Sequence, residues 1–210
     1  MARGRVAYSV SMQLVALPEA EWRLGSDRMI DDEEFFALCV ENRRLRIERA
    51  PNGEIIVMPP AGGETSYRNS GLIAQLYNWS ERDGRGRAFD SNSEFFLPNG
   101  AARGPDAAWV RGDRLAQLTK EQKRKFLYLC PDFVVELVSP SDRLSKVQAK
   151  MTEWMENGAA LGWLIDADSR TVYIYRVGKE PERLINVDHV DGESPVDGFR
   201  LKLTNIWAGL

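Results

Sequence analysis

The sequence predicts a mixed α/β domain, and three patterns carry that prediction. Residues 133–138 form an apolar run typical of a buried strand, and the chain then reads as a helix at 142–157 and a strand at 162–165. Asn52 and Gly53 separate two strand-like stretches, as in a tight hairpin. With 210 residues and 43% hydrophobic content, the chain can bury a sizeable core.

The first half of the chain opens with a segment that is hard to read, so residues 1–30 are interpreted as an N-terminal arm and residues 31–210 as one domain. Residues 31–42 begin with four acidic residues, which favour a helix N-terminus. The hairpin joins residues 45–48 and 54–58. Residues 64–82 place an apolar stripe at helical spacing, and Gly84 and Gly86 end that helix.

The second half alternates strands and helices. Strands are predicted at 87–90, 94–97, 106–110 and 133–138, with a charged helix at 119–125 between the last two. The helix at 142–157 has Ser141 as its expected N-cap and Gly158 as its stop. Strands at 162–165 and 171–175 follow. The strand, helix and strand from residue 133 to residue 165 predict a crossover connection.

Composition excludes several classes of protein. Cys39 and Cys130 lie in apolar stretches, which favours buried free thiols in a reducing cytosol over a disulfide. The single histidine, His189, is interpreted as a surface residue, and this argues against His-rich zinc sites and Ser/His/Asp triads. The net charge of −3 does not indicate a protein that binds nucleic acid mainly by neutralising its phosphates, because such proteins usually carry an excess of basic residues. No stretch reaches 18 apolar residues, and we expect a cytoplasmic protein.

Glu136 is the most informative residue, because it is an ionisable side chain inside the apolar run 133–138. An unpaired carboxylate in a covered sheet costs roughly several kcal/mol to desolvate. A metal ion or a positioned lysine would compensate the charge and would make this strand part of an active site. The alternative is a carboxylate at the solvated end of the strand, paired with an arginine.

Two further residues fit a site around Glu136. Asp106 opens the strand 106–110 and could meet Glu136 from a neighbouring strand, whereas Asp132 lies roughly 13 Å away along the same strand. The alternative for Asp106 is an ordinary turn residue after Gly-Pro. Lys150 flanks the apolar stripe of the helix 142–157 beside Trp154, and could supply the cation. Its alternative is a lysine at the stripe edge with its amine in water.

These residues together resemble a known family. The matching segments are Pro105-Asp106, Glu136-Leu137-Val138-Ser139-Pro140-Ser141, Lys150 with Trp154, Gly158, and Trp163-Leu164-Ile165-Asp166. The sequence resembles the Uma two family of endonucleases, within the restriction-endonuclease-like PD-(D/E)XK superfamily. The resemblance spans roughly residue 31 to the C-terminus, and its combination of motifs is more specific than any one of them.

The resemblance implies a restriction-endonuclease-like central mixed β-sheet flanked by helices, with Mg²⁺ or Mn²⁺ at the acidic cluster and hydrolysis of phosphodiester bonds. It implies that the active-site lysine has moved from the strand to the helix, which fits Val138 and Lys150. Glu64 matches the acidic residue near the start of the family's first core helix, and its alternative is a helix-start glutamate favoured by the macrodipole. The chain departs from the family at two positions. It has Thr65 where the family often has His, and Lys146 where the family often has an acidic residue.

We therefore expect a Mg²⁺-dependent endonuclease that acts on nucleic acid, most simply DNA. Asp106, Glu136 and Glu64 are the expected metal ligands, Glu64 directly or through water, and Lys150 would help position the nucleophile. The superfamily resemblance implies a homodimer. The alternative from another class is a non-catalytic regulatory module that keeps the nuclease fold and binds nucleic acid or protein. A glycosidase also uses paired carboxylates but has no need of the lysine.

Overall fold

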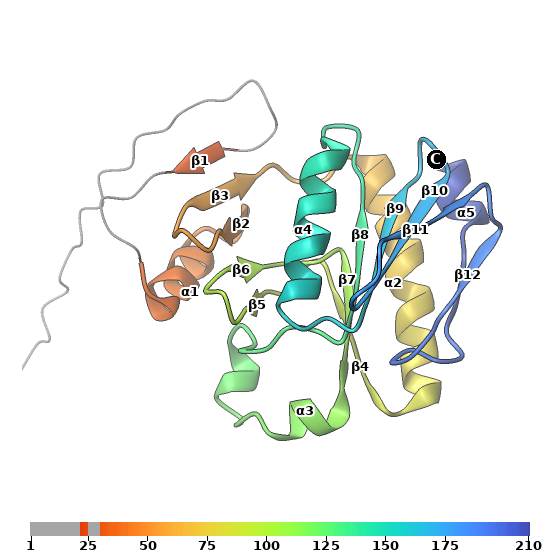
Figure 1. The fold of residues 1–210 in the computed structure, drawn as a ribbon. Helices are drawn as coiled ribbons and strands as arrows, with labels where there is room; N and C mark the ends of the chain where they lie inside the picture. Colours follow the sequence, from red (N-terminus) through yellow and green to blue (C-terminus); the bar gives the residue numbers. More distant parts are fainter. Residues whose placement is uncertain (1–21, 25–29) are drawn as a thin grey trace, which may run out of the picture.

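The computed structural model describes residues 22–24 and 30–210, and Figure 1 shows the path of the chain. Among these residues the strands form a larger sheet, a smaller sheet and a two-stranded ribbon. The predicted mixed α/β class, with a central mixed sheet flanked by helices, is confirmed. The predicted arm at residues 1–30 lies mostly outside the described residues, and the division into arm and domain stays a prediction.

The larger sheet has the order β11-β10-β9-β8-β7-β4. Its strands are β4 (Gly86–Asp90), β7 (Ala107–Arg111), β8 (Phe133–Leu137), β9 (Leu161–Asp166), β10 (Thr171–Arg176) and β11 (Glu182–Ile185). β8 and β9 are parallel and the other pairs are antiparallel. The parallel pair is joined by a helix, as parallel strands require, so the predicted crossover is confirmed.

The smaller sheet has the order β1-β3-β2-β6-β5. Its strands are β1 (Trp22–Leu24), β2 (Arg46–Arg49), β3 (Ile55–Met58), β5 (Phe95–Phe96) and β6 (Ala102–Arg103). β2 and β3 form the predicted hairpin, and Gly53 in its turn has φ +84°, a conformation that favours glycine. β5 and β6 come from the segment between β4 and β7, so they link the two sheets.

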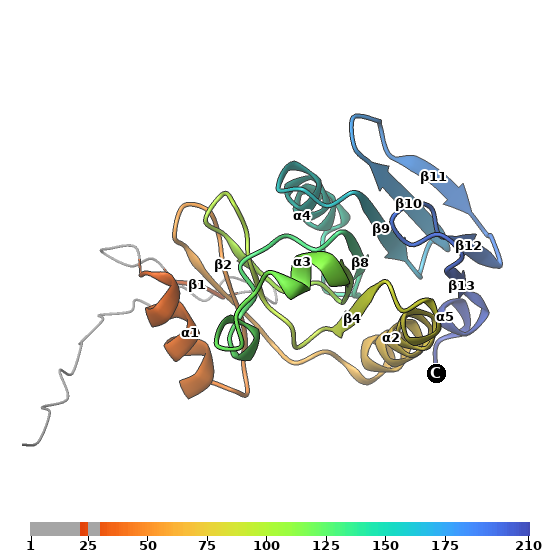
Figure 2. The same cartoon turned by 90° about the horizontal axis from the view of Figure 1, so that it is seen from below.

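Helices cover both faces of the larger sheet, as Figure 2 shows from below, with α2 and α5 on one side and α4 on the other. The helices are α1 (Asp32–Glu41), α2 (Gly63–Asp83), α3 (Gly112–Ala116), α4 (Leu144–Glu156) and α5 (Thr204–Ala208), with a short 3-10 helix at Gln122–Arg124. α1 packs beside the smaller sheet instead. It starts with a capping box between Asp31 and Glu34, in keeping with its acidic N-terminus.

The two faces of the larger sheet support separate apolar layers. Under α2 the layer is rich in aromatic side chains: Trp79, Trp109, Phe133, Trp163 and Phe199. Under α4 it is built mainly from aliphatic side chains, together with Met151, Trp154, Phe95 and Tyr175. Gly162 allows α4 to approach the sheet closely, because a Cβ at this position would lie 2.4 Å from Cε of Met151.

Some predicted elements differ from the structure for local reasons. The helix predicted at 119–125 is only the 3-10 turn, and α3 forms earlier. α4 is capped by Arg143 in extended conformation, not by Ser141, because the Asp142 carboxylate accepts from the Ser139 N–H and closes a turn ahead of the helix. The C-terminal elements β11, β12 (His189–Asp191), β13 (Arg200–Lys202) and α5 were not predicted.

Other predictions concern the two cysteines and the histidine. Both cysteines are free thiols, with Cys130 buried and Cys39 half-buried. His189 is exposed at the edge of β12. Within the described residues, the helices are either too short or too polar to cross a membrane.

Candidate active site

Glu136 lies on β8 of the larger sheet, and Asp106 immediately precedes the neighbouring strand β7. Ala107 pairs with Val135 in the antiparallel ladder of β7 and β8, so the next position outward places Asp106 beside Glu136. Side chains at directly opposite positions share one face and lie about 5 Å apart at Cβ. Oδ2 of Asp106 accepts a hydrogen bond from the backbone N–H of Leu137 at 2.8 Å, which fixes the carboxylate across the two strands.

Glu136 is buried under α4 with both of its polar contacts on one oxygen. Oε1 accepts a hydrogen bond from Nε1 of Trp154 at 2.8 Å and lies 3.0 Å from Nζ of Lys150. Within the described part of the chain, Oε2 has no hydrogen-bond or ion-pair partner. Burial raises the pKa of Glu136 to about 7, although the positive charge of Lys150 opposes the shift. The carboxylate is therefore destabilised unless more positive charge reaches it.

Lys150 projects from α4 into the centre of the cluster. Its ammonium lies between two carboxylates, because Nζ also donates to Oε1 of Glu48 at 2.8 Å. A third contact is to the backbone oxygen of Gly104 at 2.9 Å. Burial lowers the pKa of Lys150, but Glu136 and Glu48 outweigh burial, and the net shift is upward. The lysine is therefore a fixed cation that two carboxylates share.

Glu48 is the member of the cluster that sequence reasoning missed. It lies on β2 in the smaller sheet, is buried, and accepts hydrogen bonds from Lys150, from Arg103 at 3.0 Å and from the N–H of Gly104 at 3.2 Å. Burial opposes its ionisation, but Lys150, Arg103 and Arg46 lower the pKa of Glu48 to about 2. No local signal marks Glu48, because Arg46-Ile47-Glu48 alternates polar and apolar residues as a strand with one solvated face does.

Gly104 joins the two sheets at the cluster. Its backbone oxygen accepts from both Lys150 and Nη2 of Arg46, the latter at 2.6 Å, while its N–H donates to Glu48. A Cβ at this position would lie 2.9 Å from the backbone oxygen of Ser93. Glycine is therefore required where the backbone passes between the carboxylates and their cations.

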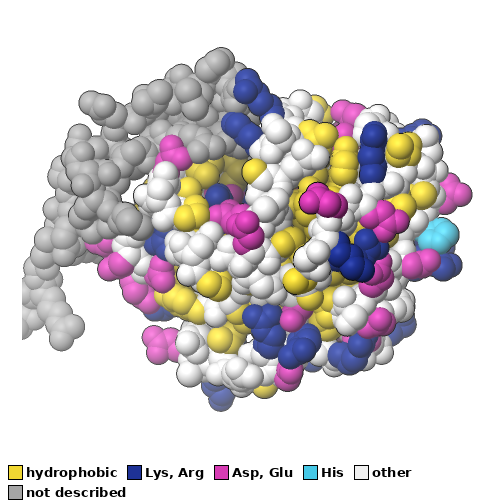
Figure 3. Space-filling model, in the orientation of Figure 1, with side chains coloured by type: hydrophobic (Ala, Val, Ile, Leu, Met, Phe, Trp, Pro, Cys, Tyr) yellow, Lys and Arg dark blue, Asp and Glu magenta, His cyan; other side chains and the backbone are white. Residues whose placement is uncertain are grey.

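The rim of the cluster holds more charged groups, and Figure 3 shows acidic and basic side chains together in a hollow between the smaller sheet and α4. Arg103 bridges Glu48 and Glu153 of α4, with Nε 2.6 Å from the latter carboxylate. Glu94 is half-buried with its Oε1 enclosed, and burial together with Glu48 raises its pKa well above the usual range. Oε1 of Glu94 has no hydrogen-bond partner in the described structure.

Glu64 lies apart from this group. It is at the start of α2, on the opposite face of the larger sheet from α4, and its side chain is 47% exposed. Its carboxylate accepts from Arg68 one helical turn later at 2.9 Å, and Arg68 also lies 3.6 Å from Asp168. The structure thus brings Asp106, Glu136 and Lys150 together and places Glu64 in a separate ion pair.

The residues present fit a hard divalent cation that keeps part of its hydration shell. No group of three or more His, Cys, Asp or Glu side chains in the described residues is already gathered as a metal cage. Mg²⁺, however, is commonly held by only one or two carboxylates plus water and substrate phosphate. Asp106 and Glu136 are adjacent buried carboxylates, and Oε2 of Glu136 is without a partner in the described structure. Mn²⁺ suits the same oxygen ligands.

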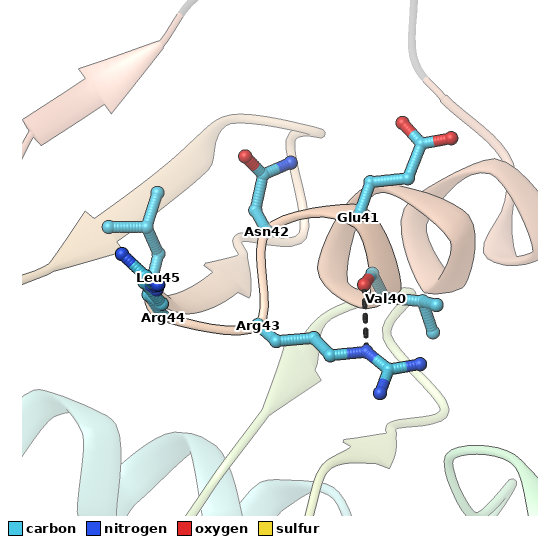
Figure 4. Close-up of a pocket in the computed structure, with 6 residues that line it drawn as sticks. All are labelled: Val40, Glu41, Asn42, Arg43, Arg44 and Leu45. Atoms are coloured by element: carbon cyan, nitrogen blue, oxygen red, sulfur yellow. Dashed lines mark hydrogen bonds between the residues drawn. The ribbon is translucent and has the colours of Figure 1, made fainter.

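A surface hollow of about 460 Å³ lies elsewhere, at the turn between α1 and β2. Figure 4 shows its lining, residues Val40 to Leu45, with Nε of Arg43 donating to the backbone oxygen of Val40 at 3.1 Å. This hollow contains none of the carboxylates described above. Its two exposed arginines, Arg43 and Arg44, lie just ahead of β2 in sequence.

Comparison with known proteins places the chain in a family. The family described as "Uma2: Putative restriction endonuclease" matches residues 32–204. The chain belongs to the Uma2 family. The resemblance inferred from the motifs around Asp106, Glu136 and Lys150 is thereby confirmed, and the matched range also contains Glu48.

A solved structure supports the fold of this Uma2 family member. The crystal structure of a "putative nuclease belonging to DUF820" from Anabaena variabilis ATCC 29413 aligns with a TM-score of 0.66 and 23% identity, covering 77% of this chain and 89% of that one. At this identity the likeness shows a shared fold. No curated protein matches the chain.

Proposed function

We propose that this Uma2 family member is a metal-dependent nuclease that hydrolyses phosphodiester bonds in nucleic acid. The observation that carries the proposal is the pair of buried carboxylates, Asp106 and Glu136, with Lys150 3.0 Å from Glu136. Family membership supports the reaction class. The charge arrangement supports the need for a cation, because Lys150 is the one ion-pair partner of Glu136 in the described structure and is shared with Glu48.

The residues have distinct roles in this proposal. Asp106 and Glu136 would hold the Mg²⁺ or Mn²⁺ ion, and the bound ion would supply a water of lowered pKa and offset phosphate charge. Trp154 orients Glu136 through its indole N–H, so that Oε2 faces away from that hydrogen bond. Lys150 positions the attacking water and stabilises negative charge that develops on the phosphate. Glu48 holds Lys150 in place through its 2.8 Å contact.

Glu64 has a weaker claim to a place in the reaction. Its ion pair with Arg68 leaves it no contact with Asp106, Glu136 or Lys150 in the described structure. It could reach the site only through water. We therefore propose Asp106 and Glu136 as the direct ligands and assign Glu64 no direct contact with the metal.

Cleavage assays test the function most simply. The wild type is incubated with plasmid DNA, single-stranded DNA and RNA, with Mg²⁺ or Mn²⁺ and with EDTA. We expect metal-dependent cleavage, most simply of DNA, that Asp106→Asn abolishes and Asp113→Asn leaves unchanged. Asp113 is a matched control because it is exposed and pairs with Arg111. Absence of cleavage on every substrate, with nucleic-acid binding retained without metal, would instead indicate a binding module.

The homodimer is a separate proposal, since cutting both strands of a duplex requires two sites or two encounters. Analytical ultracentrifugation of the wild type measures it directly. A monomer at all concentrations used in the cleavage assay would exclude the dimer without affecting the assignment of Asp106 and Glu136.

A further inference from the structure

Arg46 is a basic residue of the cluster to which the proposed reaction has so far given no role. It begins β2, and its guanidinium reaches the larger sheet, where Nη1 lies 3.3 Å from Oδ1 of Asp106 and Nη2 donates to the backbone oxygen of Gly104. Its Nε is buried and has no hydrogen-bond partner in the described structure. The two terminal nitrogens of the Arg46 guanidinium thus have hydrogen-bond partners, whereas its Nε has none in the described structure.

The contact with Asp106 falls on the oxygen that a metal ion would use. Oδ2 of Asp106 is committed to the backbone N–H of Leu137 at 2.8 Å. Oδ1 is the remaining oxygen, and Arg46 is its partner. A hard cation bound by Asp106 and the arginine therefore compete for the same atom, because two positive charges on one carboxylate oxygen repel each other.

Among the three cations of the cluster, Arg46 is the most exposed and is held by the fewest carboxylates. Its side chain is 31% exposed, against 17% for Lys150 and 11% for Arg103. Lys150 and Arg103 each bridge two carboxylates, whereas Arg46 pairs with one at 3.3 Å. The planar guanidinium also suits two oxygens of a phosphate.

We propose that Arg46 is a substrate-binding residue with two alternative partners, Asp106 in the metal-free protein and a phosphate of the nucleic acid once a metal ion takes Oδ1 of Asp106. This inference rests on the proposed nuclease function. It adds that metal binding and phosphate binding are coupled through one side chain. Two effects of opposite sign follow from removing Arg46, and a purely structural arginine would not produce both.

The first effect is on metal affinity. Calorimetric titration of Mn²⁺ into Arg46→Met, without nucleic acid, should show binding about fivefold tighter than in the wild type, because a competing ion pair worth about 1 kcal/mol is removed. Arg44→Met is the matched control, since it removes the same charge two residues earlier from an exposed side chain. It should leave the affinity for Mn²⁺ within about twofold of the wild type.

The second effect is on nucleic-acid affinity. A short labelled DNA duplex is titrated by fluorescence anisotropy with Ca²⁺ and again with EDTA, and gels verify that the duplex stays intact. With Ca²⁺, Arg46→Met should bind about tenfold more weakly than the wild type, because a charged contact to phosphate is lost. With EDTA the two proteins should differ by less than about threefold, since Arg46 then remains with Asp106.

Folding is verified by thermal denaturation, and Arg46→Lys provides a second variant that keeps the charge. Lysine lacks the forked guanidinium with which arginine contacts both Asp106 and Gly104. Arg46→Lys should therefore also bind Mn²⁺ more tightly and DNA more weakly than the wild type, but by smaller factors than Arg46→Met. Weaker or unchanged Mn²⁺ binding in Arg46→Met, or an equal loss of DNA affinity with and without Ca²⁺, would overturn the inference. A wild type that binds no Mn²⁺ and cleaves nothing would instead overturn the proposed function.

Discussion

On one face of β8, Phe133, Val135 and Leu137 pack into the aromatic layer under α2, whereas on the other face Glu136 pairs with Lys150 of α4 and lies beside Asp106. Both faces are equally buried, because β8 is covered on both sides. The two faces differ in the kind of contact that stabilises their buried side chains. The α2 face needs only shape and apolar area, while the α4 face needs partners of opposite charge at fixed positions.

This comparison explains why charged residues converge where they do. A buried carboxylate without a partner is expensive, so Glu136 fixes the position of Lys150 on α4 and of Trp154 beside it. Lys150 in turn contacts Glu48 of the smaller sheet. The polar side of β8 therefore joins two sheets and a helix through electrostatics. We expect changes on the two faces to separate activity from stability.

The largest expected effect is on the α4 face. Lys150→Met should reduce cleavage about a thousand-fold, because the group that positions the water and stabilises developing charge is lost. The affinity for Mn²⁺ should fall by much less. Single-turnover assays and calorimetry measure the two quantities, with Lys123→Met, an exposed lysine of the 3-10 turn, as the control. Cleavage by Lys150→Met within about tenfold of the wild type would remove the lysine from the mechanism.

On the α2 face the effect should appear in stability alone. Leu72 is fully buried against the sheet, and Leu72→Ala should lower the free energy of unfolding by about 2 to 5 kcal/mol. Urea denaturation measures this change. At temperatures where the variant remains folded, its affinity for Mn²⁺ should equal that of the wild type. A large loss of metal affinity would show that the two faces are not independent.

Much of the α2 face could be predicted from sequence, because helix periodicity and apolar strands are local patterns. Helix α2 and the strands β7, β8 and β9 beneath it were predicted in this way, and so were the hairpin of β2 and β3 and helix α1 beside the smaller sheet. The C-terminal strands were not predicted, because β11 has mostly exposed side chains and because β12 and β13 are only 3 residues long, too short for their alternation to stand out.

The α4 face could be predicted only in part. Glu136 stood out because its neighbours are apolar, and Asp106 and Lys150 followed from strand and helix spacing. Glu48, Arg46 and Gly104 were missed, because their contacts cross between sheets at separations of 46 to 102 residues. Glu64 was assigned through family resemblance, and the ion pair with Arg68 that holds it was not considered.

The pH dependence of metal binding sharpens the comparison further. Burial raises the pKa of Glu136 to about 7, so the proton competes with the metal ion below that pH. The affinity for Mn²⁺ should therefore rise about tenfold between about pH 6 and about pH 8 and level off above that range. Calorimetry at several pH values measures this. An affinity that is flat over the interval would show that Glu136 ionises in its usual range or is not a ligand.

The smallest expected effect is at Glu64. Because its carboxylate pairs with Arg68 and lies apart from the cluster, Glu64→Gln should change the affinity for Mn²⁺ by less than about twofold. Cleavage should change equally little. A loss of metal affinity comparable to that of a ligand variant would restore Glu64 as a ligand and would require α2 to approach the site.

The most direct test of the account is a calorimetric titration of Mn²⁺ into the wild type and Glu136→Ala, with Glu156→Ala as an exposed control on α4. We expect binding by the wild type and by Glu156→Ala, and none by Glu136→Ala, with all three proteins folded. Equal binding by the wild type and Glu136→Ala, or no binding by the wild type, would contradict this expectation and would leave Glu136 as a structural charge that Lys150 neutralises.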